Sequence, residues 1–269
     1  MASGGGRDVL VVVAHPDDEI LWHGPVLSAA TRILAAYDTT SADAALNEAR
    51  ARVRARYPLE GFEYLGLLHA DVYGQSDFLS RAPAPYGVTL MRSCPPDTAE
   101  LYRSNYDALV RAVDPYVQRH TDIYTHNPWG EYGHEEHIQV HRAMVELARR
   151  HQCSVWVWDG LAPEELVARD VWMRADYYPD ETLASLATAE LDVDLERFRE
   201  IRALYQDEGA WTWSDTYLPP SPSRYLQVVR DGTVMVTPRR LSPSRRADIA
   251  RQVVSRKARY YAGAARRRF

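Results

Sequence analysis

The feature that most constrains the fold is a short apolar run at residues 8–14, which polar turn residues follow at once. A strand that is apolar at almost every position is typical of the centre of a parallel sheet, where both faces are buried. Similar short runs recur along the chain, and they predict strands at 32–37, 62–68, 121–125 and 154–158. Helix-forming stretches alternate with them, at 20–30, 43–57, 98–119 and 134–150. This alternation predicts an α/β fold, Rossmann-like, with a mostly parallel sheet flanked by helices.

The pattern also predicts how the chain is organised. Residues 1–6 are expected to be a flexible start, 7–165 the α/β core, and 166–269 a C-terminal extension packed on it within one structural domain. A long loop is expected at 74–97. The extension is expected to hold a helix at 192–206, a hairpin at 225–236 that turns at Asp231-Gly232, and a terminal helix at 243–262.

Composition limits the class of protein. The chain is 46% hydrophobic and 26% charged, as in a soluble globular protein, and no apolar run approaches the ~20 residues of a membrane span. The start lacks the features of a signal peptide, and two cysteines, Cys94 and Cys153, are too few for a disulfide framework, so we expect a cytoplasmic protein. Nucleic acid is not expected as a partner, whereas an oligomer is compatible with the sequence.

The C-terminal end differs in charge from the remainder of the chain. Residues 239–269 hold eleven basic residues and one acid, although the whole chain has a net charge of −5. We interpret this stretch as a solvated helix and tail, with contact to an anionic partner or lipid surface as the alternative.

Two polar segments carry the chemistry. The first, at 14–19, reads Ala-His-Pro-Asp-Asp-Glu directly after the first predicted strand, and the second, at 129–137, reads Trp-Gly-Glu-Tyr-Gly-His-Glu-Glu-His after a later one. Ligands of open α/β sheets bind beyond the carboxyl ends of the strands, so both segments are expected at one edge. Either alone has a plain structural explanation, the first as a turn with a helix cap and the second as exposed helix residues. Their combination favours a site.

The residue types suggest metal-assisted hydrolysis. A catalytic zinc site uses three nitrogen or oxygen ligands and leaves one position open for water. His15, Asp18 and His137 can supply two imidazoles and one carboxylate. Asp17 is placed to take a proton from the water, and His134, three residues before His137 on the same helical face, is placed to donate to an oxyanion.

The two segments resemble the PIG-L/LmbE-like zinc de-N-acetylases, through the 14–19 motif together with Gly133-His134-x-x-His137. The resemblance is clear over about residues 8–160. It implies one zinc ion per chain, with the ligands His15, Asp18 and His137. It further implies Asp17 as general base and His134 as the group that supports the oxyanion or protonates the leaving group. Tyr132 is placed where some members have a mobile tyrosine that assists at the oxyanion, with a role as a packing aromatic as the alternative.

The chain departs from the family at two places. A glycine-rich stretch usually follows the first motif, but Trp22 and His23 stand here, so the pocket wall is expected to differ. No arginine stands three residues before Glu48, where Ala45 is found, so no sugar-binding arginine can be named. Trp22, His23 and Trp129 are candidate substrate contacts, with packing as the alternative role of Trp129.

Other histidines and tryptophans carry weaker signals. His141 is a candidate to support the site, with simple packing as its alternative. Trp211 and Trp213 are candidates for a lid, with a place in the core as their alternative. We expect no chemical role for four histidines, which are His23, His69, His120 and His151. His23 is therefore a candidate only for lining the pocket.

These observations predict a zinc-dependent hydrolase that removes an N-acyl group, most simply N-acetyl, from an amino sugar or glycoconjugate. One alternative is a non-haem Fe(II) oxygenase, because two histidines and one carboxylate also form that triad and His15-x-Asp17 has its spacing. Such sites usually lie on all-β barrels, however. A second alternative is a non-catalytic sugar-binding protein on the same fold. A dinucleotide enzyme is disfavoured because the first turn lacks G-x-G-x-x-G.

Overall fold

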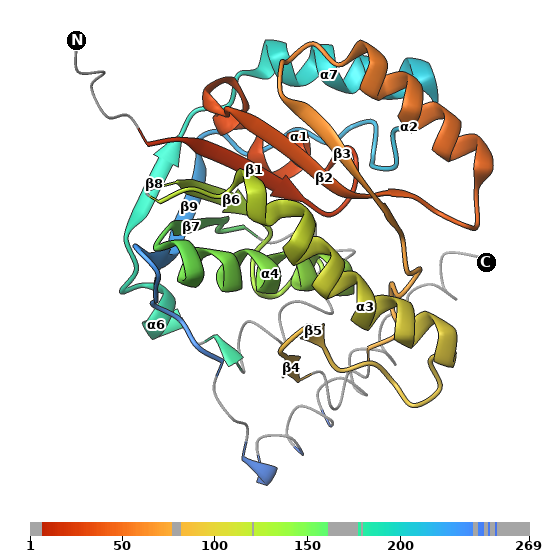
Figure 1. Ribbon diagram of the computed structural model, residues 1–269. Coiled ribbons are helices and arrows are strands. Elements are labelled where there is room, and N and C mark those ends of the chain that lie inside the picture. Colours follow the sequence, from red (N-terminus) through yellow and green to blue (C-terminus); the bar gives the residue numbers. More distant parts are fainter. Residues whose placement is uncertain are drawn as a thin grey trace, which may run out of the picture.

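The computed structural model describes residues 7–76, 82–119, 121–160, 177–178, 180–238, 242–244, 247 and 251. Within these residues one mixed sheet runs in the order β10-β9-β7-β6-β1-β2-β3, with β8 paired to β9 (Figure 1). The strands of this sheet are β1 (Val9–Val13), β2 (Arg32–Thr39), β3 (Phe62–Leu68), β6 (Asp122–Thr125), β7 (Ser154–Trp158), β8 (Thr188–Leu191), β9 (Ser223–Arg230) and β10 (Thr233–Val234). The neighbouring strands β7, β6, β1, β2 and β3 are parallel to one another, and the pairs β7–β9, β8–β9 and β9–β10 are antiparallel. The expected Rossmann-like, mostly parallel sheet is confirmed.

Helices cover both faces of the sheet. They are α1 (Asp18–His23), α2 (Ala44–Arg56), α3 (Pro96–Val113), α4 (Glu135–His151), α6 (Asp180–Leu183) and α7 (Leu195–Glu208). Figure 1 shows α2 and α7 on one side of the sheet and α3 and α4 on the other. Successive residues of a strand face opposite sides, and β1 follows this rule. Leu10 and Val12 pack into the cluster that holds the α4 residue Met144. Val11 and Val13 pack into a second hydrophobic cluster on the opposite face, together with residues of α1, α2 and α7.

Two expected helices end earlier than the sequence suggested, each because of a proline. The helix expected at 20–30 starts at Asp18, stops at His23 and continues as a 3₁₀ segment, η1 (Gly24–Ala29), that has Pro25 in its first turn. The helix expected at 98–119 runs from Pro96 to Val113 and ends in the 3₁₀ turn η2 (Asp114–Tyr116), which contains Pro115. A proline ring displaces the preceding helical turn and provides no backbone N–H.

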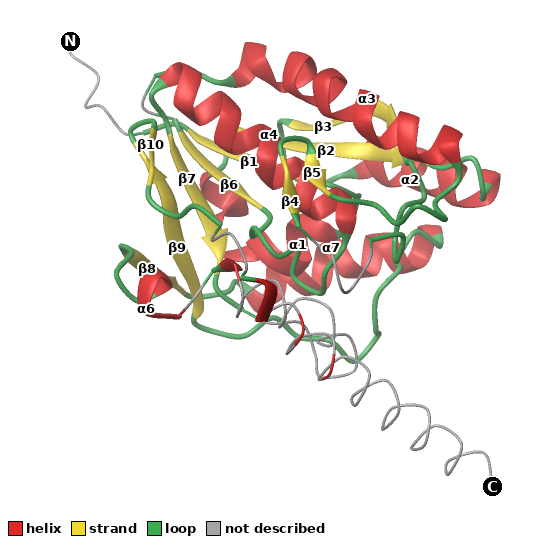
Figure 2. Ribbon diagram, turned by 90° about the horizontal axis from the view of Figure 1, so that it is seen from below, coloured by secondary structure: helices red, strands yellow, loops and turns green. Residues whose placement is uncertain are grey.

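The loop expected at 74–97 contains a small hairpin, in which β4 (Pro83–Ala84) pairs with β5 (Gly87–Val88). The hairpin expected at 225–236 is confirmed as β9 and β10. Its turn residues Asp231 and Gly232 have φ of 45° and 81°, the left-handed pair that a tight two-residue turn requires. Figure 2 shows β9 beside β7, and β10 follows β9 at the end of the sheet.

Several expectations fall on residues that the structure does not describe. These are the flexible start at 1–6, the boundary near residue 165, most of the terminal helix at 243–262 with its basic tail, and His120. Among the described residues, every helix is too short or too polar to traverse a lipid bilayer.

Candidate metal centre at the switch point of the sheet

The site lies where the strand order reverses. After β1 the chain adds β2 and β3 on one side and then returns to place β6 on the other side of β1. The loops that follow β1 and β6 therefore leave neighbouring parallel strands at the same edge, the usual binding position in open α/β sheets. The first loop carries His15 and Asp17 and leads into α1. The second spans residues 126–134 and leads into α4.

Three side chains from these segments converge on one point. The Nδ1 atom of His15 lies 3.2 Å from Oδ2 of Asp18, and Nε2 of His137 lies 3.3 Å from the same oxygen. The two ring nitrogens are 3.3 Å apart. Zinc bonds of about 2.0–2.1 Å in tetrahedral geometry separate ligand atoms by roughly 3.4 Å. The triangle of donor atoms therefore has the size that a single zinc ion requires.

Buried carboxylates fix which nitrogen of each histidine faces that point. Oε2 of Glu131 lies 2.7 Å from Nδ1 of His137, and Oε2 of Glu136 lies 3.0 Å from Nε2 of His15. When those nitrogens donate to the carboxylates, the lone pairs of the other two are directed at Asp18. Carboxylate support of this kind is typical of zinc-bound histidines. Asp18 is held as well, because the indole Nε1 of Trp22 donates to its Oδ1 at 3.0 Å.

The charges of the site are already matched to a cation. Burial acts to raise the pKa of Asp18, but the charge of His137 and hydrogen bonds from His126, His137 and His15 together hold it well below its usual value. Burial acts to lower the pKa of His137, but Asp18 and Glu131 raise it to about 10. A proton on His137 thus occupies the position where a metal ion would place its positive charge. The residues present fit zinc.

Asp17 lies beside the three donors in a different setting. Its φ of 95° is rare for a residue with a side chain. The backbone N–H and the hydroxyl of Thr212 donate to its Oδ2 at 3.1 and 2.6 Å. Burial, and then the neighbouring charge of Asp18, raise the pKa of Asp17 to about 8, although the bond from Thr212 acts against the shift. A carboxylate that titrates near neutrality is suited to proton transfer.

His134 lies over the histidine pair. Its ring stacks on His137 at 4.6 Å between centroids and lies 4.8 Å from the ring of His15. Nδ1 of His134 accepts from the backbone N–H of Glu136 at 3.2 Å and caps α4, so the hydrogen of the neutral ring is on Nε2. Burial and the nearby histidine charges hold its pKa well below the usual value, which keeps this donor neutral.

Aromatic side chains form the wall of the site. The ring of Tyr132 lies 5.2 Å from that of His137 and 5.3 Å from that of Trp213. Tyr73, 44% exposed, stacks on His134 at 5.0 Å. Trp213, a candidate for a lid, therefore lies beside the site, whereas Trp211 packs toward Tyr205 at 6.4 Å.

The three candidate substrate contacts are all buried and have no surface for a substrate. Trp22 is 1% exposed and Trp129 is fully buried among the core residues around α4. His23 is fully buried and stacks on Tyr225 at 6.0 Å. Their size, which suggested a pocket wall, is used instead for core packing and, in Trp22, for holding Asp18. His141 is likewise packed inside, with its Nδ1 bonded to the carbonyl of His126 at 2.9 Å.

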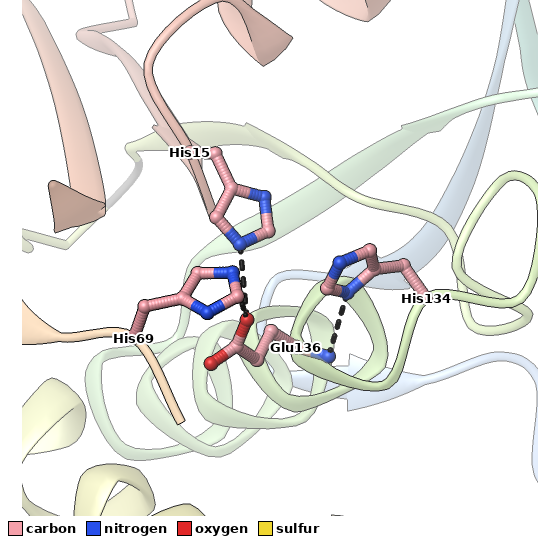
Figure 3. A group of neighbouring side chains, drawn as sticks. All are labelled: His15, His69, His134 and Glu136. Carbon is pink, nitrogen blue, oxygen red and sulfur yellow. Dashed lines mark hydrogen bonds and ion pairs between the residues drawn. The ribbon is translucent and has the colours of Figure 1, made fainter. Parts of the chain in front are cut away.

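The structure adds residues that sequence reasoning missed. His69, for which no chemical role was expected, follows β3 and lies 4.7 Å from the ring of His15 (Figure 3). Glu131, Glu136 and His126 support the donors, and Thr212 contacts Asp17 across 195 positions of sequence. His69 and His126 each directly follow a parallel strand, and this position is the sequence feature that could have indicated their place at the site.

The fold and the site thus define a Rossmann-like α/β protein with a buried cluster of possible metal-binding side chains at the switch point. The family model "PIG-L: GlcNAc-PI de-N-acetylase" matches residues 10–148, and the chain belongs to this family. A curated relative, 1D-myo-inositol 2-acetamido-2-deoxy-alpha-D-glucopyranoside deacetylase of Corynebacterium urealyticum, is 29% identical over 167 residues, 53% of this chain. The aligned part spans about half, 48%, of that relative.

Solved structures share the fold. A deacetylase–teicoplanin complex from the teicoplanin pathway superposes with a TM-score of 0.51 at 11% identity, covering 83% of this chain and 99% of the other. The zinc-inhibited form of teicoplanin deacetylase Orf2 superposes with a TM-score of 0.50 at 12% identity, covering 83% and 98%.

Proposed function

We propose that this protein is a zinc-dependent hydrolase that removes an N-acyl group, most simply N-acetyl, from an amino sugar or its conjugate. The observation that carries the proposal is the triangle of His15, Asp18 and His137, with sides of 3.2 to 3.3 Å and a separate carboxylate, Asp17, beside it. Family membership supports the reaction, and the curated relative, named for an acetamido-glucopyranoside, supports the class of substrate.

His15, Asp18 and His137 would hold one zinc ion, whose charge polarises an amide carbonyl and acidifies water. Asp17 would remove a proton from the attacking water as it bonds to the carbonyl carbon. Nε2–H of His134 would donate to the negative oxygen that develops there. When the C–N bond breaks, the proton passes to the departing nitrogen. Water and amide become a carboxylate and an amine.

Thr212 and Tyr132 have supporting roles in this scheme. The two bonds from Thr212 fix Oδ2 of Asp17, so Oδ1 of the same carboxylate would be the atom that accepts the proton of the water. Tyr132 lies between His137 and Trp213, where its hydroxyl would assist at the oxyanion after a rotation. Burial and the charges of Asp18 and Asp17 raise its pKa well above the usual value, so Tyr132 stays a hydrogen-bond donor.

The oxygenase alternative depends on a different carboxylate. Its His-x-Asp spacing would use Asp17, but the carboxylate that meets both imidazoles is that of Asp18, while Oδ2 of Asp17 is bonded to Thr212. The α/β sheet also differs from the all-β barrel on which such triads usually occur. A purely sugar-binding role gives no task to Asp17, because His15, Asp18 and His137 are the three residues that meet at the proposed metal position.

Release of free amine and acetate from a panel of N-acetylglucosaminides tests the proposal. The enzyme is stripped with a chelator and then reloaded with one equivalent of zinc. We expect stoichiometric amine and acetate after reloading and neither product before it. Oxygen consumption coupled to bound iron would favour the oxygenase instead, and binding of the sugars without product would favour the non-catalytic protein.

A further inference from the structure

A second group of donors adjoins the proposed zinc ligands and shares one residue with them. His15, His69, His134 and Glu136 each offer one nitrogen or oxygen atom, and these four atoms lie within 4.8 Å of one another (Figure 3). Nδ1 of His15 faces Asp18 and His137, while its Nε2 faces Oε2 of Glu136 at 3.0 Å. The two nitrogens of one imidazole therefore face two different clusters.

His69 and Glu136 are held as metal ligands are held. Nε2 of His69 lies 2.9 Å from Oε2 of Glu136, and its Nδ1 lies 2.8 Å from a carboxylate oxygen of Asp71. The other oxygen of Glu136 accepts from the backbone N–H of Ala70 at 2.7 Å. Carboxylate or backbone support of the far side of each ligand is typical of zinc sites. Glu136 is fully buried, and the side chain of His69 is 16% exposed, which leaves a route for an ion.

We propose that His69, Glu136 and Nε2 of His15 form a second divalent-cation site, with His134 facing the fourth position, and that its occupation by zinc inhibits the enzyme. The donor set of imidazoles and one carboxylate is one that zinc accepts. The donor atoms lie within 4.8 Å of one another, so the most distant of them have to close by at most about 1.4 Å to reach the roughly 3.4 Å between ligands of one zinc ion. The rings of His69 and His134, whose centroids are 6.2 Å apart, would have to approach each other for this.

Inhibition follows from the neighbours of the second ion. The second ion would coordinate His15, which is also a proposed ligand of the first ion. It would also bind or block His134, the proposed donor to the oxyanion. This consequence rests on the proposed function, whereas the existence of the site does not. The second ion should bind more weakly than the first, because it must displace to solvent the hydrogens that link His15 and His69 to Glu136, which leaves His15 as an imidazolate that bridges the two ions.

The test is zinc binding to the full chain, measured by equilibrium dialysis and elemental analysis across buffered free zinc. We expect two ions, the second weaker, on the native protein. His69→Gln should bind one ion with unchanged affinity for it, because the glutamine amide still donates to Glu136 but is a poor zinc ligand. His151→Gln, which alters a histidine paired with Asp114 at the end of α4, is the matched control and should bind two.

A second variant avoids any change within the cluster. Asp71→Asn removes the carboxylate behind His69 and should weaken the second ion by about 10- to 100-fold while sparing the first. Asp71 has a φ of 54°, a conformation that asparagine adopts readily, so this variant is expected to fold. Saturation of the native protein at one ion, or retention of two by His69→Gln, would overturn the second site.

Activity separates this proposal from the proposed function. Amine release should rise with the first equivalent of zinc, fall with excess zinc, and stay high in excess zinc for His69→Gln. Two bound ions with no hydrolysis of any N-acetyl sugar would overturn the proposed function and leave the second site standing. Hydrolysis with two bound ions but no inhibition would overturn the inhibitory role.

Discussion

The loops after β1 and β6 and the segment after α7 build the same site in opposite ways. The loops and the first turns of the helices that follow them supply buried ionisable groups that bond to one another, among them His15, Asp18 and His137. The segment at 210–217 supplies a backbone N–H, the hydroxyl of Thr212 and aromatic rings. The family match covers the loops and ends before this segment. The difference suggests that the loops carry the chemistry, while the later segment adjusts and encloses it.

The largest effect is expected from the shared carboxylate of the loops. Asp18→Ala removes the oxygen that both imidazoles approach, so zinc binding and amine release should both fall to background. Elemental analysis after dialysis and the amine assay measure the two losses. A variant that keeps one tightly bound zinc ion would show that Asp18 is not a ligand.

The next effect separates binding of metal from chemistry within the same loop. Asp17→Asn keeps the shape of the side chain but cannot take a proton, so kcat should fall about 10²- to 10⁴-fold with zinc content unchanged. Steady-state kinetics on the zinc-loaded variant provide the measurement. Wild-type turnover would remove Asp17 from the mechanism.

A smaller effect is expected from a carboxylate that is hydrogen-bonded to a proposed zinc ligand. Glu131→Gln replaces the carboxylate that accepts from Nδ1 of His137, so zinc affinity should fall about 10- to 100-fold while kcat at saturating zinc changes less. Competition with a chelator measures the affinity. Glu146→Gln, on the outer part of α4, is the control and should leave zinc affinity unchanged.

The smallest effect is expected from the segment after α7, and it should appear in the pH profile. Burial and Asp18 raise the pKa of Asp17 to about 8, and a base works when deprotonated, so the rate should rise with pH. A bound cation favours the carboxylate and moves the midpoint below 8. The bonds from Thr212 act in the same direction.

Thr212→Val removes the hydroxyl bond, so the midpoint should shift upward, by at most about one unit, and the rate near pH 7 should fall by up to about tenfold. Thr212→Ser should restore both. Equal loss of activity at every pH in Thr212→Val, without rescue by serine, would contradict the idea that this segment adjusts Asp17.

The features that could be predicted from the sequence are those that local pattern determines. The run at 8–14 and its counterparts mark the parallel strands, because burial on both faces leaves a continuous apolar signal. The positions of His15 and His137 after strands then predict that they meet at one edge of the sheet. Their closeness is observed, whereas their role as zinc ligands stays a prediction.

Features that depend on contacts distant in sequence could not be predicted in this way. Thr212 lies in a segment without a motif, and only the packing of α7 brings it to Asp17. His69 lacks any neighbouring motif, although it follows a strand. Trp129 resembled a sugar-stacking residue because it lies close to the second motif, but the loop turns its ring into the core. Position in sequence does not determine on which side of a loop a side chain lies.

The most direct test of the central claim is a crystal structure of the enzyme loaded with one equivalent of zinc, with anomalous diffraction recorded at the zinc edge. The account predicts one strong peak at about 2.0–2.2 Å from Nδ1 of His15, a carboxylate oxygen of Asp18 and Nε2 of His137. A peak elsewhere, with those three atoms uncoordinated, would contradict it.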